Sequence, residues 1–139
     1  MKPNQLPHQY NDGGRSLAGY SGKTGDCVVR ALAISTGTSY INMYSKTNQM
    51  LRDLEIGQRS KSASASGVYN TTLAKLMRKF KFKWVANRNR SKFIKIPKTG
   101  TYIVAFTYHV SVVKDGIIQD TYNPFDEIGN FVRGYWKVA

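Results

Sequence analysis

A cysteine, a histidine and an aspartate are spaced in this chain as a thiol nucleophile and its two helpers would be. Cys27, the only cysteine among 139 residues, stands where a helix-forming run begins. Unpaired backbone N–H groups and the positive end of a helix dipole favour a thiolate there. His109 lies far downstream in a strand-like run, and Asp120 follows across a short turn. This order predicts a nucleophile, its base and the group that orients the base.

The turn between His109 and Asp120 fixes which side chains share a face. If Asp115-Gly116 form the centre of a tight turn, Ser111 lies opposite Asp120. Because side chains alternate along a strand, residues 109, 111 and 113 point the same way as residues 118, 120 and 122. Asp120 is therefore predicted to be a diagonal neighbour of His109, within reach of its ring.

Two alternatives remain open at this point. Asn123 has the opposite parity to Asp120 and would orient His109 only if the strand ended or bulged before it. A purely structural interpretation also fits, in which Cys27 is a small buried apolar residue, His109 is a hydrogen-bonded core residue and Asp120 caps a turn.

The residues around this constellation resemble papain-like cysteine peptidases, especially the branch that processes bacteriocin leaders. That similarity lies in Gly100 to Phe106, His109 to Val113 and Asp115 to Pro124. A second resemblance, to small phage and prophage proteins described as cysteine peptidases, lies in Asn11 to Arg15, Gly25 to Ala31 and Gly134 to Trp136. These resemblances imply a papain-like fold, with Cys27 as nucleophile, His109 as base and Asp120 as orienting residue. They also imply a peptide or protein substrate and no cofactor.

One feature of papain-like enzymes is missing from the sequence. Those enzymes place a glutamine or asparagine a few residues before the cysteine as an oxyanion donor, whereas residues 19–24 offer only hydroxyls, Lys23 and backbone N–H groups. Gln9 and Asn11 are stand-ins if the N-terminal segment folds back. Losing one such donor costs about 100-fold or more in rate, so weak or absent activity is one expectation.

Composition and length predict a single domain spanning residues 1–139. No apolar run reaches membrane-spanning length, and the first residues lack the apolar stretch of a signal peptide. We therefore expect no membrane partner and a cytoplasmic location. If the protein is phage-encoded, this means the cytoplasm of the host cell, and association with the virion is the alternative. One cysteine and two histidines also make a zinc cluster implausible.

Positive charge is concentrated in the middle of the chain. Thirteen of the 21 basic residues and none of the eight acidic ones lie between Glu55 and Asp115, and the net charge is +13. Such a field predicts a polyanionic partner, either nucleic acid or an acidic protein. The candidate binding residues are Arg78, Lys79, Lys81, Lys83, Arg88, Arg90 and Lys92. Interleaved aromatics could stack on bases, or Phe80, Phe82 and Trp84 could be core-facing residues of an edge strand with lysines on the solvent side.

Periodicity predicts an α+β fold, with N-terminal helices packed on a mostly antiparallel C-terminal sheet. Helices are expected from Cys27 to near Gly37, from Tyr40 to Leu54 and from Asn70 to Phe80, with Asp26 or Thr24 capping the first. Strands are expected at Phe82 to Ala86, Tyr102 to Phe106, Tyr108 to Val113, Ile117 to Thr121 and Val132 to Val138. Residues 1–24 are expected to form an irregular arm, and residues 58–67 a mobile polar loop.

Two functions are consistent with these observations. The first is a cysteine peptidase or related acyl hydrolase with a Cys-His-Asp triad, acting on an acidic or polyanion-associated substrate. The second is a catalytically weak or inactive phage protein that binds nucleic acid or an acidic host or virion protein through its basic middle segment.

Overall fold

The computed structural model describes residues 6–20, 25–88, 95–127 and 129–138, which contain three α-helices and a six-stranded sheet. The strands lie in the order β1-β5-β4-β3-β6-β2, and all neighbours are antiparallel except the parallel pair of β1 and β5. In chain order the elements are β1 (His8–Tyr10), α1 (Cys27–Thr36), α2 (Tyr40–Leu54), α3 (Asn70–Lys79), β2 (Lys83–Ala86), β3 (Thr101–Phe106), β4 (Val110–Lys114), β5 (Ile117–Asp120), the 3-10 helix η1 (Pro124–Asp126) and β6 (Val132–Lys137).

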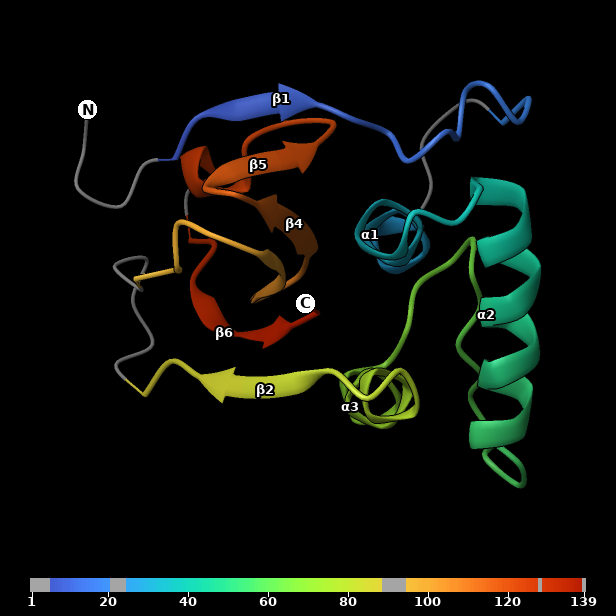
Figure 1. The fold of residues 1–139 in the computed structure, drawn as a ribbon. Helices are drawn as coiled ribbons and strands as arrows, with labels where there is room; N and C mark the ends of the chain where they lie inside the picture. Colours follow the sequence, from blue (N-terminus) through green and yellow to red (C-terminus); the bar gives the residue numbers. More distant parts are fainter. Residues whose placement is uncertain (1–5, 21–24, 89–94, 128, 139) are drawn as a thin grey trace.

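The three helices lie on one side of the sheet, with α1 and α3 between the sheet and α2 (Figure 1). Helix α1 ends at Gly37, whose φ of 71° is a left-handed conformation that glycine adopts at little cost. Helix α2 begins at Ser39, whose side chain accepts a hydrogen bond from the N–H of Asn42. Among the described residues, no helix is both long and apolar enough to cross a membrane.

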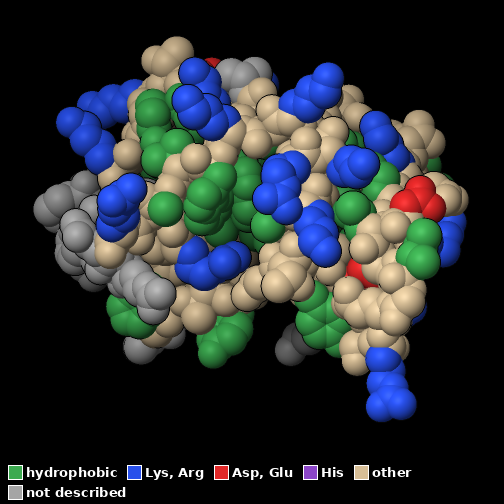
Figure 2. Space-filling model, turned by 90° about the horizontal axis from the view of Figure 1, so that it is seen from below, with side chains coloured by type: hydrophobic (Ala, Val, Ile, Leu, Met, Phe, Trp, Pro, Cys, Tyr) green, Lys and Arg blue, Asp and Glu red, His purple; other side chains and the backbone are tan. Residues whose placement is uncertain are grey.

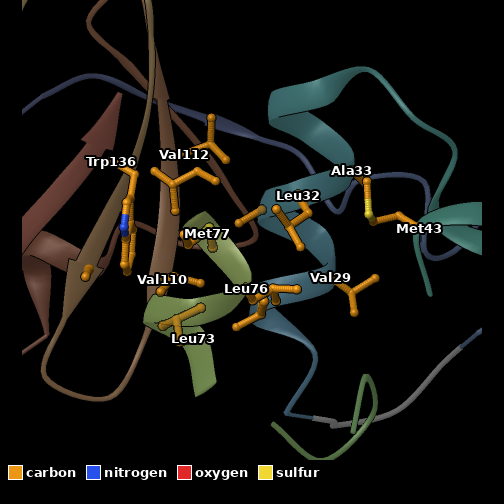
Figure 3. Close-up of a cluster of buried hydrophobic side chains, with 14 of the residues drawn as sticks. Val29, Leu32, Ala33, Met43, Leu73, Leu76, Met77, Val110, Val112 and Trp136 are labelled. Atoms are coloured by element: carbon orange, nitrogen blue, oxygen red, sulfur yellow. The ribbon is translucent and has the colours of Figure 1, made fainter. Parts of the chain in front are cut away.

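Apolar side chains fill both faces of the central strands. On the helix side, Leu32 of α1, Leu76 of α3, Val112 of β4 and Trp136 of β6 meet in one cluster (Figure 3). On the other face, a second cluster lies under η1 and includes Tyr102, Phe106, Ile118, Phe125 and Val132. This double burial explains why β3 and β4 are buried almost throughout, with apolar residues at every buried position except Ser111, rather than alternating.

The predicted α+β organisation is confirmed, and so is the register of the hairpin between β4 and β5. Val113 pairs with Ile118 and Lys114 with Ile117. The turn residues Asp115 and Gly116 both have positive φ, of 50° and 78°, as a tight two-residue hairpin turn requires.

The described part of the arm predicted for residues 1–24, residues 6–20, is not wholly irregular. It contains β1, which pairs in parallel with β5 from His8 opposite Ile118 to Tyr10 opposite Asp120. All three residues of β1 are exposed, so no apolar alternation in the sequence predicts this strand. Backbone pairing with β5 and side-chain hydrogen bonds of His8 and Gln9 hold it in place. Of the two predicted caps of α1, Asp26 occupies the cap position but makes no side-chain cap hydrogen bond, and Thr24 lies outside the described residues.

The polar loop at residues 58–67 is tied to the end of α2. Glu55, which is 2% exposed, accepts hydrogen bonds from the backbone N–H and the hydroxyl of Ser62, both at 2.7 Å. Thr72 of α3 donates to the same carboxylate at 2.7 Å. Ser64 is buried and donates to the carbonyl of Tyr44 at 2.8 Å, so the loop closes over α2.

Candidate active site

Three elements bring the predicted site residues to the same end of the sheet. Cys27 is the first residue of α1, His109 immediately precedes β4, and Asp120 is the last residue of β5. A tight turn closes the β3–β4 connection, where the N–H of Phe106 donates to the carbonyl of His109 at 2.7 Å. Cys27 and His109 line a common cleft of about 380 Å³.

The opposite wall of this cleft is formed by residues 66–70, which lie against the segment before Cys27. The N–H of Gly25 donates to the carbonyl of Ala65 at 2.8 Å. A Cβ atom at Gly25 would lie 2.8 Å from the carbonyl oxygen of Ser66, closer than real Cβ contacts, so only glycine fits without a backbone shift. The thiol is therefore flanked by one wall from residues 66–70 and another from the β3–β4 turn.

Asp120 holds His109 through a short hydrogen bond. The ring Nε2 of His109 donates to Oδ2 of Asp120 at 2.7 Å, and Asp120 is 5% exposed. The hydroxyl of Ser111 donates to the same oxygen at 2.6 Å, while the N–H of Thr121 donates to Oδ1 at 2.7 Å. Both carboxylate oxygens are thus fixed. With Nε2 directed to Asp120, Nδ1 is the His109 nitrogen left for chemistry with Cys27.

The electrostatics of the three side chains favour a thiolate–imidazolium pair. Burial raises the pKa of Cys27, but a hydrogen bond with His109, the charge of His109 and the N–H of Val110 outweigh it and bring the pKa below its ordinary 9.0. Burial lowers the pKa of His109, but its hydrogen bonds with Asp120 and Cys27 raise it overall to about 9. Burial likewise raises the pKa of Asp120, and its bond with His109 reverses this to a net decrease.

The choice between Asp120 and Asn123 is settled geometrically. Asp120 makes the contact with His109, as strand parity predicted. The side-chain oxygen of Asn123 instead accepts from the N–H of Phe125 at 3.1 Å and caps η1, and its amide donates to the carbonyl of Leu6 at 3.4 Å.

Gln9 and Asn11 do not replace the missing oxyanion donor. Both side chains are hydrogen-bonded to Gln119, Gln9 at 3.0 Å and Asn11 at 3.3 Å. They line a separate hollow with Gln119 rather than the cleft of Cys27. Folding back of the N-terminal segment therefore builds β1 without bringing an amide to the thiol. Lys23 lies outside the described residues.

Sequence reasoning missed several residues that support the site. Ser111 was placed opposite Asp120 by the register but received no role, although its hydroxyl at that position could have indicated one. Asp26, beside the thiol and 1% exposed, pairs with Nε of Arg15 at 3.2 Å and Nε of Arg30 at 3.6 Å. Tyr40 donates to it at 2.6 Å. The charge of Arg30 also contributes to the lowered pKa of Cys27.

Five of the predicted polyanion-binding residues are described, and all five are exposed. Arg78 and Lys79 end α3, Lys81 lies in the connection to β2, Lys83 begins β2 and Arg88 follows it. Arg90 and Lys92 lie outside the described residues. Figure 2 shows the face beneath α3 and β2, where Lys and Arg side chains surround apolar ones and few acidic side chains are seen. Strand β2 lies at the edge of the sheet, as the second interpretation predicted, but Phe80 and Phe82 precede the strand and Trp84 is exposed rather than core-facing.

No family model, curated protein or solved structure matches this chain. In the described ranges, no three His, Cys, Asp or Glu side chains are grouped so that they could hold a metal ion.

Proposed function

We propose that the protein is a cysteine peptidase or related acyl hydrolase with a papain-like arrangement, in which Cys27, His109 and Asp120 form the catalytic triad. The observation that carries this proposal is that Asp120 holds His109 by a hydrogen bond beside a cleft that Cys27 also lines, where His109 lowers the pKa of the Cys27 thiol. The packing of the Cys27 helix on the sheet that carries His109 and Asp120 supports the same arrangement.

The proposed reaction has two stages. In the first, the Cys27 thiolate attacks the carbonyl carbon of the scissile bond, and His109 gives its proton to the leaving nitrogen or oxygen as that bond breaks. A thioester to Cys27 results. In the second, His109 takes a proton from water as the water oxygen attacks the thioester carbon. The carbon–sulfur bond then breaks, which releases the carboxylic acid product and restores the thiolate, while Asp120 keeps the imidazole oriented throughout.

Stabilisation of the oxyanion falls to backbone groups in this proposal. The first N–H groups of an α-helix have no partner within the helix, and Cys27 contributes the first of them in α1. A negative charge that develops on the carbonyl oxygen would be favoured there by this N–H and by the helix dipole. With fewer side-chain donors than papain-like enzymes have, we expect a modest turnover rate.

Cleavage of a complex peptide mixture tests the proposal. The wild-type protein should generate new peptide termini that mass spectrometry detects, and Cys27→Ala should generate none above background. Asn123→Ala is the matched control, because Asn123 lies near the site in sequence but does not contact His109, and it should retain cleavage. Equal cleavage by the wild type and by Cys27→Ala would contradict the proposal.

A second candidate function is a non-catalytic protein that binds nucleic acid or an acidic protein through its basic face. The five exposed cations from Arg78 to Arg88, in a segment of the sequence without carboxylates, favour it. Binding of this kind would be salt-dependent and indifferent to Cys27→Ala, which separates it from the peptidase proposal.

A further inference from the structure

A groove of about 690 Å³ lies beside the cleft that contains Cys27. It is lined by Trp84, Ala86, Asn87, Arg88, Thr107, Phe131, Val132 and Arg133. Thr107 and Arg133 line both the groove and the cleft, so the two hollows adjoin at these residues. A chain that is bound across Cys27 could therefore continue into the groove.

The groove presents two aromatic side chains to solvent. Trp84 is 40% exposed and Phe131 is 49% exposed. The Trp84 ring packs beside Trp136, with ring centroids 4.5 Å apart. It also lies over Gly134, where a Cβ atom would come within 2.6 Å of two ring atoms. The absence of a side chain at Gly134 therefore allows Trp84 to lie where it does, as a fixed apolar surface for a bound side chain.

The charge of the groove is positive. Arg133 is partly buried, and its Nε donates to the carbonyl of Phe106 at 3.2 Å while Nη2 approaches the side-chain oxygen of Asn70 at 3.5 Å. These contacts hold the guanidinium at the junction between groove and cleft. Arg88 adds an exposed cation further out. The described residues that line the groove include two arginines and no carboxylate, so this lining complements an acidic ligand.

We propose that this groove binds the part of a polypeptide substrate next to the scissile bond, with Arg133 pairing with an acidic side chain and with Trp84 and Phe131 contacting an apolar one. The inference rests on the proposed function, because the continuity of groove and cleft argues for a ligand whose carbonyl reaches Cys27. For the same reason a peptide is favoured over nucleic acid. Specificity would then depend on an apolar residue flanked by acidic residues close to the bond.

Binding to the Cys27→Ala protein separates this inference from catalysis. The ligands are fluorescently labelled hexapeptides with one Phe flanked by Glu, by Gln or by Lys, together with single-stranded DNA and RNA 12-mers, measured by fluorescence anisotropy. The Glu peptide should bind about tenfold or more tighter than the Gln peptide, as expected for a charge-assisted contact with a partly buried guanidinium. The Lys peptide should bind most weakly.

Two groove variants and one control complete the test. Arg133→Gln should reduce affinity for the Glu peptide about tenfold, and exposed Arg88→Gln about two- to fivefold. Lys75→Gln removes an exposed cation of the same basic segment that does not line the groove, and it should leave affinity nearly unchanged. Arg88→Gln keeps the test decisive if Arg133→Gln fails to fold.

Three results would overturn the inference: equal binding of the Glu and Gln peptides, equal losses in Lys75→Gln and Arg88→Gln, or tighter binding of the 12-mers with losses in the same groove variants. Selective binding of the Glu peptide without any cleavage by the wild type would support the groove and reject the peptidase. Cleavage by the wild type that shows no preference for acidic residues would do the reverse.

Discussion

Two buried carboxylates, Asp120 and Glu55, are similar in burial and in the direction of their pKa shifts, and they differ in their hydrogen-bond partners. Asp120 is 5% exposed and Glu55 is 2% exposed. Burial raises the pKa of both carboxyls, but hydrogen bonds outweigh it and hold both pKa values below the ordinary range. By burial, by pKa and by number of donors, neither could be singled out as functional.

The difference lies in the partners. Glu55 accepts from the hydroxyls of Ser62 and Thr72 and from a backbone N–H, an arrangement that ties a loop and α3 to the end of α2. Asp120 accepts from His109, an ionisable ring that lines the cleft with Cys27 and lowers the pKa of its thiol. Connection to a nucleophile, rather than burial or a shifted pKa, distinguishes the candidate catalytic carboxylate from the structural one.

The largest expected effect follows from Cys27→Ala, which removes the end point of the Asp120 network. Hydrolysis should fall by about 10⁴-fold or more, because the thioester can no longer form. Stability should change little, because only one sulfur at the edge of a cleft is lost. Initial rates and thermal unfolding check this. A large drop in stability would instead indicate a buried structural thiol.

Asp120→Asn should have the next largest effect, on the order of 100-fold in rate, because the imidazolium loses its charged partner. The pKa of His109, about 9 in the wild type, should fall towards its ordinary 6.5. Titration of His109 by NMR in the variant and in the wild type measures this directly. An unchanged pKa of His109 would show that the contact with Asp120 does not control the ring.

Unlike the substitutions at Cys27 and Asp120, Glu55→Gln should lower stability and leave the rate of hydrolysis per folded molecule nearly unchanged. An amide replaces one acceptor oxygen with a donor facing hydroxyl donors, at a cost of about 1–3 kcal/mol in the free energy of unfolding. Denaturant unfolding measures the cost, and exposed Asp53→Asn is the matched control. A large rate loss in folded Glu55→Gln would erase the distinction between the two carboxylates.

The smallest expected effect is a change in how the free energy of unfolding depends on pH at acid pH when Glu55 is replaced by Gln. Because the pKa of folded Glu55 is lowered from 4.5, its stabilisation is present above pH 4.5 and is lost as pH falls through the folded value. Glu55→Gln should therefore lose less stability than the wild type over that acid range. Unfolding free energies measured at several pH values test this, and parallel profiles would contradict it.

The sequence predicted the Asp120 region well because local rules control it. Asp115-Gly116 determine the turn, the turn determines the register, and strand parity then places Asp120 rather than Asn123 against His109. The three helices could also be predicted from the sequence, because apolar spacing indicates each helix, Gly37 marks the end of α1 and Ser39 marks the start of α2.

Contacts between distant segments could not be predicted in this way. Strand β1 has no buried side chain, and the pairing of Asp26 with Arg15, Arg30 and Tyr40 depends on how the arm and two helices pack. Arg133 reaches Asn70, 63 residues away, and no local periodicity reports such a contact. The cleft's second wall and its adjoining groove therefore emerged only from the structure.

The rate of alkylation of Cys27 as a function of pH tests the central claim most directly. Cys27 is the only cysteine, so iodoacetamide reports on one thiol without interference. In the wild type the midpoint of the rate profile should lie below pH 9.0, because His109 lowers the pKa of the thiol. In His109→Ala the midpoint should move to higher pH, because burial is then opposed only by the N–H of Val110 and the charge of Arg30. Superimposable profiles for the two proteins, both centred at the ordinary thiol pKa, would contradict a thiolate–imidazolium pair.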